Sequence, residues 1–87
     1  MVASHHTLDT SGLHCPLPVL KAKKAAKAMK TGDILTVLAT DPASRIDFDH
    51  YCHVSGHSLL SASEEDGVFT YRIEIGTLAD QDPSFPA

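Results

Sequence analysis

The sequence has no tryptophan, only two cysteines and 6% aromatic residues. Its longest mainly apolar run, Ile34 to Ala39, is far shorter than the roughly 20 residues of a transmembrane helix. The first six residues lack the basic and then apolar pattern of a signal peptide. We therefore expect no membrane partner and a cytoplasmic protein, in which two thiols do not imply a structural disulfide.

Basic residues are also few, with 7 Lys and Arg against 11 Asp and Glu and a net charge of −4. This balance, and the lack of aromatic residues on a basic strand face, argue against direct binding of nucleic acid. With 43% hydrophobic and 21% charged residues, the 87-residue chain is typical of a globular protein. We expect residues 1–76 to form a single domain and residues 77–87, with Pro83 and Pro86, to be a flexible C-terminal tail.

Most of the positive charge lies in one segment. It holds five lysines, Lys21, Lys23, Lys24, Lys27 and Lys30, and all eleven carboxylates lie elsewhere. Such a segment is either a solvated helix face or a basic surface that steers an acidic protein partner. In the second case, Lys21 and Lys24 are the candidates for partner docking.

Hydrophobic periodicity and turn residues predict six elements in the order β-α-β-α-β-β. Strands are expected at residues 6–10, 34–40, 59–63 and 68–75, and helices at residues 18–30 and 42–55. Gly32 and Gly56 would end the helices, Asp41 would cap the second one, and residues 64–67 would form a hairpin turn. The predicted fold is α/β (α+β), a two-layer sandwich with two helices on one face of a mixed four-stranded sheet whose first two strands are parallel.

The same periodicity predicts which side chains face the core. These are Val19, Ala22, Ala26 and Met29 in the first helix, Ile46, Phe48 or Asp49, Tyr51 and Val54 in the second, and Phe69, Tyr71, Ile73 and Ile75 in the last strand.

The segment Gly12-Leu13-His14-Cys15-Pro16-Leu17-Pro18 places a cysteine directly before a helix. Pro18 suits the first helical turn, and Pro16 keeps Cys15 outside the helix. A thiol there faces unpaired N–H groups and the positive end of the helix dipole, which favour the thiolate. We expect Cys15 to be an exposed, reactive sulfur held by a turn that Pro16 and Pro18 fix; the alternative is a small buried hydrophobe.

Two neighbours of this turn have two interpretations each. His14 either stabilises a thiolate or relays a proton, or it is an exposed turn residue without a role. Asp41 is most simply a helix cap. It also has a second possibility, a functional contact with the start of the first helix, because the carboxyl ends of parallel strands lie at one edge of a sheet.

Cys52 is best interpreted as a packed cysteine near the end of the second helix. One alternative is a resolving thiol that forms a disulfide with Cys15. Another is zinc binding, because His50, His53 and His57 surround Cys52 at helical spacing. Gly56 interrupts the helix before His57 and no Cys-x-x-Cys motif is present, so we expect neither a metal nor a cofactor.

The Cys-Pro-x-Pro motif and its surroundings resemble the TusA/SirA-type sulfur carrier family over residues 8–75. The matching landmarks are Leu8-Asp9, Gly12 to Lys21, Lys24, Met29, Gly32-Asp33, Thr40-Asp41-Pro42, Asp47-Phe48, Gly56-His57 and Asp66-Gly67. The resemblance implies a sulfurtransferase-type carrier, rather than a stand-alone enzyme, that holds sulfur as a persulfide on Cys15. It implies a cysteine desulfurase or rhodanese-like protein as donor and a DsrE-like or relay protein as acceptor. The destinations known in the family include 2-thiouridine in tRNA, molybdenum cofactor assembly and sulfur oxidation.

Two other functions stay open on the sequence. One is a non-catalytic regulatory or nucleic-acid-binding module in which Cys15 only shapes the turn. The other is a thiol redox enzyme that uses both Cys15 and Cys52.

Overall fold

The structure is a computed structural model that describes residues 4–76. Its elements are β1 (His5–Thr10), α1 (Leu17–Lys27), β2 (Ile34–Ala39), α2 (Ser44–Ser55), β3 (Ser58–Glu65) and β4 (Val68–Glu74). The predicted order of elements is confirmed. The tail predicted at residues 77–87 lies outside the described residues, and the domain boundary at residue 76 stays a prediction.

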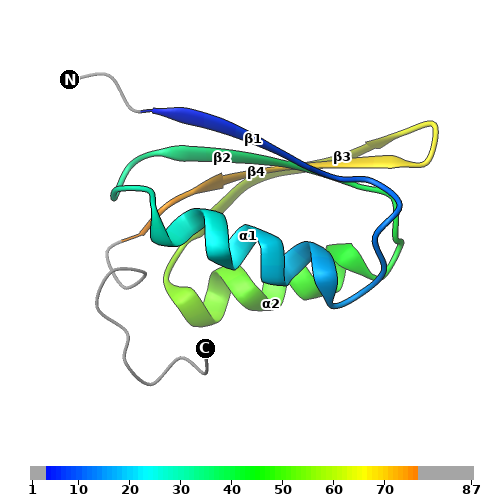
Figure 1. Cartoon of the computed structure of the whole chain (residues 1–87), viewed down its shortest axis with the longest axis horizontal. Helices are drawn as coiled ribbons and strands as arrows, with labels where there is room; N and C mark the ends of the chain where they lie inside the picture. Colours follow the sequence, from blue (N-terminus) through cyan, green and yellow to red (C-terminus); the bar gives the residue numbers. More distant parts are fainter. Residues whose placement is uncertain (1–3, 77–87) are drawn as a thin grey trace.

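The four strands form one mixed sheet in the order β1-β2-β4-β3. β1 and β2 are parallel, whereas β4 pairs antiparallel with both β2 and β3. Both helices lie side by side on one face of this sheet and run in the same direction (Figure 1). The two-layer sandwich is therefore confirmed, and its connections bring the starts of α1 and α2 to the same end of the molecule.

The core lies between the helices and the inward faces of β2 and β4. Ala22 and Ala26 are buried, so α1 packs closely on the sheet as predicted. Phe48 of α2 stacks on Tyr71 of β4 with ring centroids 4.9 Å apart. The Tyr71 hydroxyl is within 2.7 Å of the Ser44 hydroxyl, which satisfies both buried groups.

Two of the predicted core positions in α2 are wrong. Ile46 is 75% exposed and Val54 is 41% exposed. The buried face of α2 instead consists of Ser44, Phe48, Tyr51, Cys52 and Ser55, which follow the spacing i, i+4, i+7, i+8 and i+11. Ile46 and Val54 lie off that face, and this leaves two apolar side chains toward solvent.

The helix ends also differ from the prediction. α1 ends at Lys27, because the N–H groups of Ala28 and Met29 turn back to carbonyls only three residues earlier. Gly32 does not cap the helix; it adopts a φ of +94° in the turn to β2 and donates its N–H to the Ile75 carbonyl at 2.9 Å.

α2 begins at Ser44 with Ala43 as its N-cap, so Asp41 and Pro42 precede the helix and the predicted cap at Asp41 is wrong. Asp66 and Gly67 both have positive φ and form the two-residue hairpin turn between β3 and β4. No helix within residues 4–76 has the length and apolar character that a bilayer span requires.

Candidate functional site

The carboxyl ends of β1 and β2 bring the cysteine turn and the β2–α2 loop together. The strands are parallel and in register up to Thr10 and Ala39, so the segments that follow them leave the sheet side by side. The Thr10 carbonyl accepts the Leu13 N–H at 3.1 Å, and the Gly12 N–H donates to the Thr40 hydroxyl at 2.9 Å. These bonds fold the turn that precedes Cys15.

Asp41 anchors this turn to the start of α2. Its Oδ2 accepts the backbone N–H of Cys15 at 2.6 Å, and its Oδ1 accepts that of Ala43 at 3.0 Å. These two bonds lower the pKa of the Asp41 carboxyl, and the nearby His14 lowers it further. The carboxylate thus joins two segments that are 26 residues apart in the chain.

Cys15 lies just before α1, as predicted, and its side chain is exposed. The peptide bond from Cys15 to Pro16 is cis, Pro16 is the N-cap, and Pro18 is buried in the first helical turn. The prolines have different surroundings, because Pro16 is exposed beside the sulfur whereas Pro18 packs inward.

The expectation that the start of α1 favours the Cys15 thiolate is wrong. The pKa of the Cys15 thiol is raised above its ordinary value, first by a hydrogen bond to the Asp47 side chain. Partial desolvation and the negative charges of Asp47 and Asp41 raise this pKa further. The lysines follow the cysteine along the helix, whereas the carboxylates come from the neighbouring segment, which the linear sequence does not place beside it.

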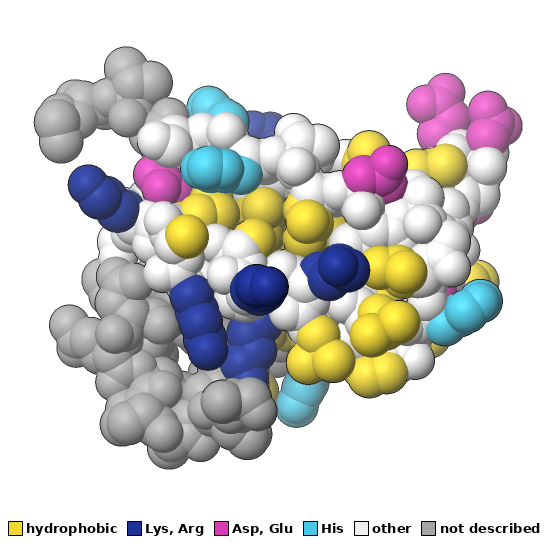
Figure 2. Space-filling model, viewed as in Figure 1, with side chains coloured by type: hydrophobic (Ala, Val, Ile, Leu, Met, Phe, Trp, Pro, Cys, Tyr) yellow, Lys and Arg dark blue, Asp and Glu magenta, His cyan; other side chains and the backbone are white. Residues whose placement is uncertain are grey.

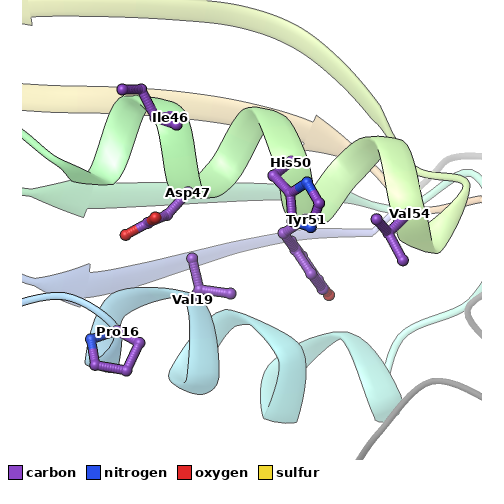
Figure 3. Close-up of a pocket in the computed structure, with 7 residues that line it drawn as sticks. All are labelled: Pro16, Val19, Ile46, Asp47, His50, Tyr51 and Val54. Carbon is purple, nitrogen blue, oxygen red and sulfur yellow. The ribbon is translucent and has the colours of Figure 1, made fainter.

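A groove of about 350 Å³ lies between the two helices beside Cys15. Its lining residues are Pro16 and Val19 of the first helical segment and Ile46, Asp47, His50, Tyr51 and Val54 of α2 (Figure 3). Ile46 and Val54, which the periodicity assigned to the core, therefore line this groove. The Asp47 carboxylate points into it from the first turn of α2.

Neither the place of Asp47 beside Cys15 nor the groove was predicted from the sequence. Two features of the sequence could have indicated them. Asp47 belongs to one of the landmarks of the resemblance, and Ile46 and Val54 are apolar positions out of phase with Phe48.

The lysines of α1 form a basic band along the outside of the helix (Figure 2). Lys21 and Lys24 are both exposed, as is His14 in the cysteine turn. Hydrophobic side chains gather toward the start of α1 in the same view. Leu17 and Leu20 are 45% and 50% exposed there, so the surface near Cys15 is apolar with a basic flank.

Cys52 has the opposite environment. It is 2% exposed in the hydrophobic core, and both cysteines are free. Burial raises the pKa of the Cys52 thiol to about 12. The prediction of a packed cysteine is confirmed, and no disulfide joins it to Cys15.

The histidines around Cys52 do not gather into a cluster. Among residues 4–76, no group of three His, Cys, Asp or Glu side chains is arranged to hold a metal ion. His57 is buried, with its Nδ1 accepting the Gly76 N–H at 3.0 Å and its Nε2 3.1 Å from the Tyr51 hydroxyl. Because Nδ1 accepts, Nε2 carries the proton and donates to Tyr51. His57 thus ties the end of β4 to α2.

Known proteins resemble this chain in sequence and in fold. The family described as Sulfurtransferase TusA matches residues 6–75 of the chain. A Neisseria meningitidis protein whose name describes a candidate sulfur carrier is 57% identical over 68 residues, which cover 78% of this chain and 92% of that protein. The sulfur carrier protein TusA of Allochromatium vinosum is 49% identical over 67 residues, 77% of this chain and 88% of its own. The crystal structure of a SirA-like protein from Desulfitobacterium hafniense superposes with a TM-score of 0.74 at 33% identity, covering 82% of this chain and 97% of that one.

Proposed function

This chain belongs to the TusA sulfurtransferase family, and from that premise we propose that it carries sulfane sulfur as a persulfide on Cys15. It accepts the sulfur from a protein donor and passes it to a protein acceptor. The observation that carries this proposal is the exposed Cys15 side chain, held outside the helix by the bond from its N–H to Asp41. A carrier needs a sulfur that two different proteins can reach in turn.

The transfer itself is an exchange between sulfur atoms without net oxidation. The Cys15 thiol loses its proton, and the thiolate attacks the terminal sulfur of the donor's persulfide. A new S–S bond forms on Cys15 while the S–S bond of the donor breaks. The donor sulfur leaves with the electron pair as a thiolate.

The neighbours of Cys15 hold it in place for this exchange. Pro16 and Pro18 restrict the backbone on both sides of Leu17, so the sulfur is presented at one position. Asp41 anchors the Cys15 backbone, and His14 balances the negative charge of Asp41 when its imidazole is protonated.

Partner recognition is assigned to the apolar surface near Cys15 and its basic flank. Lys21 and Lys24 would steer an acidic partner toward the sulfur. We propose a cysteine desulfurase or a rhodanese-like protein as donor and a DsrE-like or relay protein as acceptor. The transfer is assigned to the cytoplasm, where thiols stay reduced. It would feed tRNA thiolation, cofactor assembly or sulfur oxidation.

Intact-mass spectrometry after incubation with a cysteine desulfurase and cysteine tests the proposal. We expect the wild-type protein to gain the mass of one sulfur atom and to lose it again on treatment with dithiothreitol. Cys52→Ser, the matched control, should load equally, whereas Cys15→Ser should not load. Loading of Cys15→Ser to the wild-type level would contradict the assignment to Cys15.

A further inference from the structure

Two threonines at the carboxyl ends of β1 and β2 join these strands beyond their backbone pairing. The Thr10 side chain is buried, and its hydroxyl donates to the Leu38 carbonyl at 2.5 Å. In the opposite direction, the Gly12 N–H donates to the Thr40 hydroxyl at 2.9 Å. The base of the cysteine turn is therefore bound to β2 and to the residue directly after it.

Gly12 lies where the chain changes direction toward the cysteine. The Leu13 N–H bonds back to the Thr10 carbonyl at 3.1 Å and closes a β-turn, in which Gly12 has a φ of +83°. Gly12 is exposed, so packing alone does not fix its place. The bond to Thr40 therefore holds a part of the turn that lies at the surface.

Thr40 and Asp41 hold the cysteine turn at two points. Thr40 accepts the N–H of Gly12. Asp41, the next residue, accepts the N–H of Cys15, three residues further along the turn. One hydrogen bond alone would let the turn pivot about it, whereas two bonds from adjacent side chains fix its direction. The second oxygen of Asp41 accepts the Ala43 N–H, so both points belong to the loop that leads into α2.

We propose that Thr40 is a positioning residue for sulfur transfer, whose hydroxyl fixes the direction in which the turn presents Cys15 to a protein partner. It does so by holding Gly12, while Asp41 holds Cys15 itself. This inference rests on the proposed function, because it concerns the encounter of Cys15 with its donor and its acceptor. Thr40 forms and breaks no covalent bond and takes no proton from the sulfur.

Direction matters more for a protein partner than for a small reagent. Two sulfur atoms must meet in line while two protein surfaces are in contact, so a displaced Cys15 lowers the fraction of productive encounters. A small alkylating reagent reaches an exposed sulfur from many directions. A loss of positioning should therefore slow transfer between proteins and leave alkylation unchanged, whereas a loss of exposure would slow both.

Single-turnover loading of Cys15 from a persulfidated cysteine desulfurase, at saturating donor, measures this effect. Thr40→Val keeps the shape of the side chain but removes the acceptor for the Gly12 N–H. We expect it to lower the loading rate by about twofold to fivefold and to leave the rate of Cys15 alkylation by iodoacetamide unchanged. Thr40→Ser keeps the hydroxyl and should load at the wild-type rate.

Thr36→Val is the matched control, because it makes the same substitution four residues earlier, within β2. It should load at the wild-type rate. Amide hydrogen exchange at Gly12, followed by NMR, reports on the bond itself. We expect exchange at Gly12 to be about tenfold faster in Thr40→Val and unchanged in Thr40→Ser and Thr36→Val.

The outcomes distinguish the two proposals. If Thr40→Val loads at the wild-type rate although exchange at Gly12 is faster, the role of Thr40 is overturned and the carrier function stands. Unchanged exchange at Gly12, equal losses of loading and alkylation, or no recovery in Thr40→Ser would also overturn it, as would an equal loss in Thr36→Val. If wild-type Cys15 takes up no sulfur at all, the proposed function fails and this inference fails with it.

Discussion

The two cysteines have nearly opposite environments within one small fold. Cys15 lies outside its helix, exposed, with carboxylates of a neighbouring segment beside it. Cys52 lies inside its helix, 2% exposed among apolar side chains. The pKa of both thiols is raised, but by different causes: a hydrogen bond and negative charge at Cys15, and desolvation at Cys52. Access therefore separates the two sulfurs, because Cys15 is exposed and Cys52 is buried.

The largest expected effect is on alkylation. In the folded protein, iodoacetamide should modify Cys15 readily, whereas Cys52 should react only through opening of the core. For a domain of ordinary stability, this slows modification by several orders of magnitude, about a thousandfold or more. Peptide mapping over time measures both rates. Equal rates in native buffer would contradict the burial of Cys52, whereas in denaturant the two rates should become similar.

The effect on the free energy of unfolding should have the reverse order, with Cys52→Ser more destabilising than Cys15→Ser. Cys52→Ser places a hydroxyl in the core and should lower the free energy of unfolding by about 1–3 kcal/mol. Cys15→Ser changes an exposed position and should leave the urea midpoint unchanged. Urea titration followed by circular dichroism compares the two variants. A larger loss in Cys15→Ser would mean that this cysteine has a structural role.

Asp41→Ala should impair sulfur loading without preventing it. The substitution removes the acceptor for the N–H groups of Cys15 and Ala43, so the turn is no longer held against α2. We expect the loading rate to fall by about threefold to tenfold, because the sulfur samples more positions. Asp49→Ala, which removes an exposed carboxylate from α2, is the matched control. An unchanged loading rate in Asp41→Ala would show that the Asp41 hydrogen bonds are not needed for sulfur loading.

Lowering the pH should weaken the hydrogen bonds that Asp41 and Asp33 accept from backbone N–H groups. The pKa values of Asp41 and Asp33 are lowered from an ordinary value of 3.8 by backbone hydrogen bonds, so folding favours their ionised forms. Their contribution to stability is present above pH 3.8 and is lost as the pH falls through the lowered values. The urea midpoint should therefore fall on acidification below about pH 4, and Asp33→Asn should make that fall shallower.

The smallest effect is expected at the basic flank. Lys24→Glu should slow sulfur uptake from an acidic donor by about twofold to fivefold at low salt, and the difference should vanish at high salt. Lys30→Glu, at the far end of the same lysine-rich segment, is the control. An equal effect of the two variants would indicate general charge attraction in place of docking beside Cys15.

Much of the fold was predictable because local signals and tertiary packing agree. The alanines at 22 and 26, the apolar β2 and the Asp66-Gly67 turn each determine their own element, and all lie where expected. The wrong predictions concern residues whose roles depend on contacts with residues distant in the sequence. Gly32 lies in a turn that bonds to Ile75, directly after β4, and Asp41 binds the cysteine turn in place of capping α2.

The site was predictable only in part for the same reason. The prolines identified Cys15 as a residue outside the helix, because their effect on the backbone is local. The acidic contact from Asp47 was missed, since it depends on how α2 packs against α1. The same packing left Ile46 and Val54 in the groove and not in the core.

The central claim is that the exposed sulfur, and not the buried one, carries the cargo. Isotopically labelled sulfur supplied through a cysteine desulfurase, followed by alkylation and peptide mapping, tests it most directly. We expect the label on the peptide that contains Cys15, and it should leave when an acceptor thiol is added. Label on the Cys52 peptide, or uptake that persists after Cys15 has been blocked, would contradict it.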